Sequence, residues 1–264
     1  MTSSDFSCAG ILSVWNAQSV QAVFFVATTE GLKADDIFQK IWETEPETST
    51  RNKVPRPDNP FLSVAAGQVA DFASEIQVQP GRVDIHVVAV AEHEEPGFAT
   101  INAENAIRDL AQRVGAVNAI SVPIVRLALV SNLLNPTDNL DSANNIIFNL
   151  LGFDPQITGT DITFQFNSRK PFGFESSLAM NRLLRYQALS FQQFAISIGN
   201  GNFSQNPVPV GPPPTFGVSL VVDLNTAPDG RFIESKNIAP IFEEFASEAL
   251  RIGETGQLKA LKDK

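Results

Sequence analysis

The order of the local sequence patterns constrains the fold of this chain more than any other feature. The strand-like segment Val20–Thr28 precedes a helical one, Ala34–Glu43, and strand patterns then continue to Ala91. Two further helical segments and a group of strands follow, before a last helix that begins near Asn237. Because strands and helices do not alternate one by one, the pattern argues against a doubly wound sheet or a barrel. It predicts an α+β fold, with antiparallel sheets and helices packed on one face.

Shorter patterns place individual elements. Pro80-Gly81 predicts a turn, so the segments on either side should form a hairpin. Alternation over Asp84–Ala91 predicts a strand that has Ile85 on one face and His86 on the other. Residues Leu178–Leu189 are compatible with a strand or a helix, and their alternation favours the strand.

Helix starts and a domain boundary can also be placed. The side chains expected to cap helices are those of Asn102, Asp141 and Asn237. A loop that opens at Asn135-Pro136 suggests two α+β lobes of similar size, residues 1–135 and 136–264. One continuous domain is the alternative, since 264 residues fit either arrangement. No internal repeat is evident in the sequence.

The composition excludes several classes of protein. The chain carries 19 Lys and Arg against 29 Asp and Glu, a net charge of −10, and 43% of it is hydrophobic. That share is too high for a disordered acidic protein. The charge argues against a nucleic-acid binder with a broad basic surface, because neutralising phosphates requires clustered Lys and Arg.

The expected location is the cytoplasm. Cys8 is the single cysteine, which excludes a disulfide framework or a Cys-rich zinc site and suits a reducing compartment. The first thirty residues hold no Lys or Arg, and no apolar run approaches the ~20 residues that cross a bilayer. We therefore expect neither a signal peptide nor a membrane segment.

The candidates for chemistry centre on two histidines. His86 lies in a predicted strand, and His93 lies in the acidic loop that also holds Glu92, Glu94 and Glu95. A histidine paired with Glu92 could act as an acid–base pair in a hydrolase or lyase. A metal site needs three or four converging ligands, and none is expected here. No cofactor is expected either, because glycine-rich phosphate loops and a nucleophile elbow are missing.

Phenylalanine is unusually frequent, with 20 residues against one tyrosine. Phe172, Phe174 and Phe203 fall in predicted loops, where a ring is difficult to bury. Exposed rings that cluster mark a partner surface. These three residues are therefore candidate binding residues, together with Glu94 and Glu95 of the acidic loop.

Three segments carry a resemblance to a known family: Ile124–Asn132, Leu220–Asn225 and Ile241–Phe245. With them the chain resembles a sporadically distributed, uncharacterised family of bacterial proteins of about this length. Ser131 stands where that family usually has an aromatic residue before the asparagine. The resemblance implies a bacterial context and suggests an accessory role in defence, immunity or a toxin–antitoxin-like system. It implies no catalytic residue.

The function favoured by these observations is a non-enzymatic protein-binding or assembly protein. Low charge, the phenylalanine excess and 19 Asn with 14 Gln suit a specific interface, because interface cores are depleted of charge. The partner would be another protein or a second copy of the chain, not nucleic acid or a membrane. Two alternatives stay open: the hydrolase or lyase, and a sensor that binds a small molecule in a phenylalanine-lined cavity between two lobes.

Overall fold

One antiparallel sheet of ten strands forms the centre of the molecule. The computed structural model describes residues 15–90, 97–116, 119–153, 162–192, 194–195, 198–199, 202–203, 208–209 and 213–262. The strand order is β2-β3-β4-β5-β1-β7-β14-β9-β8, and β6 pairs with β1. The sheet strands are β1 (Asn16–Val26), β2 (Thr48–Arg51), β3 (Ser63–Val69), β4 (Phe72–Gln79), β5 (Arg82–Ala89), β6 (Ile101–Asn102), β7 (Ile124–Thr137), β8 (Thr163–Pro171), β9 (Ala179–Phe191) and β14 (Thr215–Thr226).

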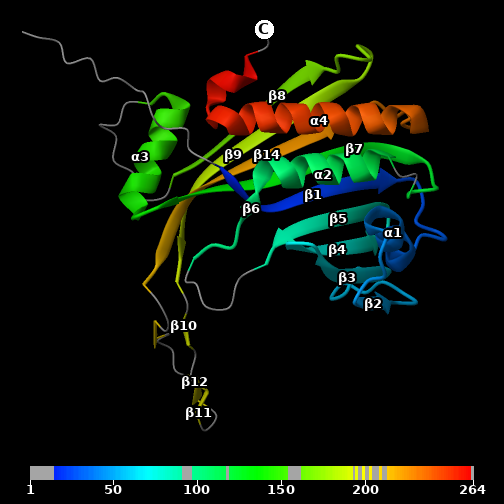
Figure 1. Cartoon of the computed structure of the whole chain (residues 1–264), viewed down its shortest axis with the longest axis horizontal. Coiled ribbons are helices and arrows are strands. Elements are labelled where there is room, and N and C mark those ends of the chain that lie inside the picture. The colour runs from blue at the N-terminus through cyan, green and yellow to red at the C-terminus, as the bar shows by residue number, and fades with distance from the viewer. Residues whose placement is uncertain are drawn as a thin grey trace, which may run out of the picture.

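Four α-helices lie on one side of this sheet (Figure 1). They are α1 (Ala34–Trp42), α2 (Ala103–Ala116), α3 (Leu140–Leu151) and α4 (Ser235–Thr255), with the 3₁₀ turn η1 (Leu258–Leu261) after α4. Beyond the sheet, β9 and β14 continue into an arm (Figure 1). Its short strands are β10 (Phe194–Ala195), paired with β13 (Val208–Pro209), and β11 (Ile198–Gly199), paired with β12 (Asn202–Phe203).

The sheet consists of two successive units with similar element order. In the first unit, β1 is followed by α1, strands β2 to β5 and α2; in the second, β7 is followed by α3, strands β8, β9 and β14, and α4. β1 pairs with β7 at the centre, β5 flanks β1, and β14 flanks β7. The two units are therefore related by an approximate twofold axis that passes between β1 and β7.

The hydrophobic core lies between the sheet and the helices. α2 and α4 pack against each other over the central strands, so closely that a Cβ on Gly115 would lie 3.1 Å from the Cα of Ala239. The Phe242 ring of α4 lies 5.4 Å from the ring of Phe24 on β1. Each unit thus contributes its last helix to a shared core.

The predicted fold class is confirmed, because the sheet is antiparallel and the helices cover one face. The hairpin around Pro80-Gly81 is present as β4 and β5, and residues 179–191 form a strand. The boundary considered between residues 135 and 136 lies inside β7, and the sheet continues across it.

Helix caps agree with the sequence in one case and differ in two. Asn102 accepts the backbone N–H of Asn105, as predicted. The cap of α3 is Asn139, whose side chain accepts the N–H of Ser142, and not Asp141. The helix α4 begins at Ser235, before Asn237, and its capping residue Glu234 makes no side-chain capping bond.

No helix in the described ranges is long and apolar enough to cross a membrane.

Candidate functional site

The face of the sheet that lies opposite the helices carries a continuous set of polar side chains. Residues directly opposite each other on neighbouring strands point to the same face. One such row runs across both units and consists of Asp84, Val23, Ala128, Asn225 and Asn181. No described helix covers this row, and we call the surface around it the uncovered face.

In the first unit, the uncovered face is organised around Asp84. Its carboxylate accepts hydrogen bonds from the side-chain amides of Gln21 and Gln79, at 2.5 and 2.8 Å. It also accepts two from the guanidinium of Arg82, at 2.9 and 2.6 Å. Asp84 is only 1% exposed, so these four bonds compensate for the loss of water around a buried charge. This cluster is fully satisfied and rigid.

In the second unit, the corresponding cluster is organised around Asn225. Its side-chain carbonyl accepts hydrogen bonds from Arg126 and, at 2.9 Å, from Asn181. Its amide donates to the carboxylate of Asp223 at 2.8 Å. The amide carbonyl of Asn181 in turn accepts from Arg169 at 3.0 Å. The chain of bonds holds two arginines in fixed positions on the face.

A phenylalanine ring connects the two clusters. Phe25 of β1 lies opposite Arg82 on one side and opposite Arg126 on the other. Both guanidinium groups lie 5.3 Å from the centre of its ring, within the range of a cation–π contact. The three side chains form one preorganised group across three strands.

The twofold relation of the units is also visible in these clusters. The last strand of each unit carries the pair Val-Asp, as Val83-Asp84 and Val222-Asp223. Asp84 lies opposite a valine of β1, and Asp223 lies opposite Val130 of β7. The two aspartates therefore occupy equivalent places on either side of the central pair of strands.

The second unit leaves several hydrogen-bond donors unused. Arg126, Arg169 and Arg185 have no carboxylate within ion-pair distance among the described residues, whereas Arg82 has Asp84. The Nε of Arg126 is buried without a hydrogen-bond partner. Arg185, in the same face, is exposed and makes no hydrogen bond to any part of the chain that is described. A guanidinium with free donors matches carboxylate oxygens.

The structure places His86 on the uncovered face, opposite Glu75 of β4 and Gln21 of β1. Burial lowers the pKa of His86, while the charges of Asp84 and Glu75 raise it and that of Arg82 lowers it; the net shift is downward. The imidazole is therefore neutral near pH 7. Glu92, His93, Glu94 and Glu95 lie outside the described residues.

The predicted phenylalanine patch needs a correction. Phe172 is 2% exposed and its ring lies 5.7 Å from that of Phe245, so the expectation that it is exposed was wrong. It follows directly on the strand β8, and the middle of α4 packs against it. Phe174 is 43% exposed and packs on Phe172 at 5.5 Å. Phe203 lies in β12, and its side chain is outside the described part of the structure.

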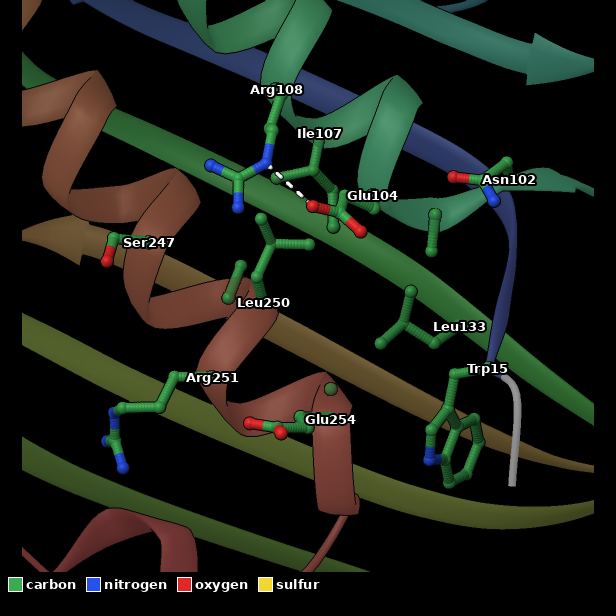
Figure 2. Close-up of a pocket in the computed structure, with 13 residues that line it drawn as sticks. Trp15, Asn102, Glu104, Ile107, Arg108, Leu133, Ser247, Leu250, Arg251 and Glu254 are labelled. Atoms are coloured by element: carbon green, nitrogen blue, oxygen red, sulfur yellow. Dashed lines mark hydrogen bonds and ion pairs between the residues drawn. The ribbon is translucent and has the colours of Figure 1, made fainter. Parts of the chain in front are cut away.

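A groove on the opposite, helical side of the sheet has a volume of about 590 Å³ (Figure 2). Trp15, Ile107, Leu133 and Leu250 form its apolar part, between α2, α4 and β7. An ion pair between Glu104 and Arg108, at 3.0 Å, lies at its rim. Its lining contains no phenylalanine, so it differs from the phenylalanine-lined cavity expected for a sensor.

Metal binding has no structural support in the described ranges. They contain no group of three or more His, Cys, Asp or Glu side chains that could hold an ion.

Comparison with known proteins adds no relative. No protein-family model matches this chain, and neither curated proteins nor solved structures give a match.

Sequence reasoning missed the clusters on the uncovered face. Arg126, Asp223 and Asn225 lie in two of the segments that carry the family resemblance. The available signal was the alternation around Asp223, because its neighbours Val222 and Leu224 are apolar and buried against the helices. The position of Asn181 and Arg169 beside them depends on strand register, which a single sequence does not provide.

Proposed function

We propose that this chain is a non-enzymatic binding protein and that a partner protein docks on the uncovered face. The observation that carries the proposal is a set of three arginines of the second unit that have no carboxylate partner among the described residues. Arg126 and Arg169 are held by amides, and Arg185 is exposed beside them. Donors that are already positioned lose little conformational entropy when they bind. The segment that they recognise is acidic and presents carboxylates to these donors.

The charge distribution supports a protein partner over nucleic acid. The cations of the uncovered face are few and share it with the carboxylates of Asp223 and Glu75. Nucleic-acid binding needs many phosphate contacts from clustered cations. A short acidic segment needs only the few guanidinium groups that lack a carboxylate.

The enzyme alternative has less support. His86 lies near Asp84, but that carboxylate already accepts four hydrogen bonds and is buried. It is therefore not free to share a proton with an imidazole. The pairing of a histidine with Glu92 stays a prediction, because residues 92 and 93 lie outside the described part of the chain. His86 also lies opposite Glu75.

The wider setting is part of the same proposal. We place the protein in the bacterial cytoplasm, as an accessory component of a defence, immunity or toxin–antitoxin-like system. This setting depends on the family resemblance and on the composition, and the docking surface does not require it.

Replacing Arg185 by glutamine should weaken the binding of an acidic peptide. The probe is a fluorescein-labelled hexaglutamate peptide, and its binding is followed by fluorescence anisotropy. Loss of one hydrogen-bonded charge pair, ~1 kcal/mol, should raise the dissociation constant about fivefold. The matched control is Arg108→Gln on the helical side, where binding should not change.

Two outcomes would contradict the proposal. One is an equal effect of Arg185→Gln and Arg108→Gln, which would show attraction without a defined site. The other is tighter binding of oligothymidylate than of the peptide, which would favour nucleic acid.

A further inference from the structure

The sheet ends at β8, and its outer side has no partner strand in the described part of the chain. β8 is nine residues long and pairs with β9 in an unbroken register from Thr163 to Pro171. The opposite edge, β2, has only four residues. A long edge strand presents unpaired backbone N–H and C=O groups, which can pair with another strand.

β8 has few of the features that normally prevent an edge strand from pairing with another chain. Proteins protect edges with bulges, prolines and outward charges. From Thr163 to Ser168 the strand has none of these, and Lys170 turns inward to the buried carboxylate of Glu248 at 3.3 Å. On the helical side of the strand, Phe166 is 39% exposed.

We infer that β8 pairs with β8 of a second copy of this chain, antiparallel, about a twofold axis at Asn167. This pairing would continue the sheet from one copy into the other. The inference uses the edge of the sheet and does not depend on the proposed partner of the uncovered face.

The register about Asn167 brings no two like charges opposite each other. It places Arg169 opposite Gln165 of the second copy and Lys170 opposite Phe164 of the second copy. Like charges directly opposite each other would destabilise the pairing. β8 contains no acidic residue, so the acidic residues that give the chain its net negative charge lie in other segments.

The apolar side of the strand favours a second copy over an acidic segment of another protein. In this register Phe166 lies opposite Ser168 of the second copy and diagonal to its Phe166, within reach of an aromatic ring. Each ring would cover the other. An acidic strand would leave the Phe166 ring, 39% exposed, without an apolar contact across this edge.

Two substitutions on the same strand test this register. Both Asn167→Asp and Gln165→Glu add one negative charge to an exposed position of the same face, two residues apart. Asn167→Asp would place two carboxylates opposite each other at the twofold axis. Gln165→Glu would place each new carboxylate between Arg185 of its own chain and Arg169 of the second copy. Sedimentation equilibrium and light scattering on the full chain measure the dimer dissociation constant.

The unmodified chain should show twice its monomer mass of 28.6 kDa at high concentration. The dissociation constants of the two variants should differ by about tenfold, with Asn167→Asp weaker and Gln165→Glu equal to or tighter than the unmodified chain. Circular dichroism melting confirms that both variants fold. A monomer at every concentration, or an equal effect of the two substitutions, overturns the inference. Neither result bears on the peptide binding tested with Arg185→Gln.

Discussion

Replacing Phe242 by alanine should lower the free energy of unfolding by about 3–5 kcal/mol, the range for truncating a buried phenylalanine. The side chain is fully buried between Phe24, at 5.4 Å, and Phe245, at 6.0 Å. Phe242 belongs to the second unit and Phe24 to the central strand of the first. The cavity would therefore open between the units, and both should lose stability together in one transition.

Urea unfolding followed by circular dichroism and by tryptophan fluorescence measures this effect. The matched control is Phe232→Ala, which removes the same atoms from a ring that is 63% exposed, and it should change stability by no more than about 0.5 kcal/mol. Coincident curves from the two probes would support one cooperative domain. Two separate transitions would instead support the two lobes considered from the sequence.

The sequence alone predicts the structure correctly where a pair of residues determines the backbone conformation of a turn. Pro80-Gly81 specifies the turn between β4 and β5, with Gly81 at φ +74°, and the alternation that follows places His86 away from the core. The segment Leu178–Leu189 is compatible with a strand or a helix because Leu183 and Leu184 are apolar at successive positions. The structure explains this, since Leu184 faces the helices and Leu183 is half-buried on the uncovered face.

Long-range placement could not be predicted from this sequence. Asn135-Pro136 has the composition of a turn, but the pairing of Asn135 with Val218 extends β7 through it. The expected exposure of Phe172 failed for a similar reason, because α4 returns over the end of β8 from more than sixty residues away. The twofold relation of the units is equally hidden, because only short pairs such as Val-Asp recur in the sequence.

A buried network of ion pairs connects α4 to β8 and β9 in the second unit. Glu248 of α4, 3% exposed, accepts from Arg182 of β9 at 3.0 Å and from Arg251 at 2.6 and 2.9 Å. Lys170 of β8 lies 3.3 Å from the same carboxylate. Burial alone raises the pKa of Glu248, but hydrogen bonds from Arg251 and Arg182 and the charge of Lys170 lower it to about 2, from an ordinary value of 4.5.

Replacing Glu248 by glutamine should destabilise the chain by about 3–5 kcal/mol, because it removes a buried carboxylate that accepts from the Arg182 guanidinium at 3.0 Å. The matched control is Glu243→Gln, an exposed position on the same helix. Thermal unfolding near pH 7 measures the difference. A loss no larger than that of the control would show that the network is not important for stability.

The pH dependence of this loss follows from the direction of the pKa shift. A carboxylate whose pKa is lower in the folded state than in the unfolded state stabilises the fold above the unfolded value. This contribution, ~3 kcal/mol for a shift of this size, is fully present above about pH 4.5 and disappears as the pH falls to about 2. The free energy of unfolding of the unmodified chain should therefore fall as the pH falls through this window. Plotted against pH, it should change less steeply for Glu248→Gln and as steeply as in the unmodified chain for Glu243→Gln. Lys170 and Arg182 come from β8 and β9, the edge strand and its neighbour, so protonation of Glu248 should loosen this edge first. Amide hydrogen exchange at pH 3 would then be faster in β8 and β9 than in β1 and β7.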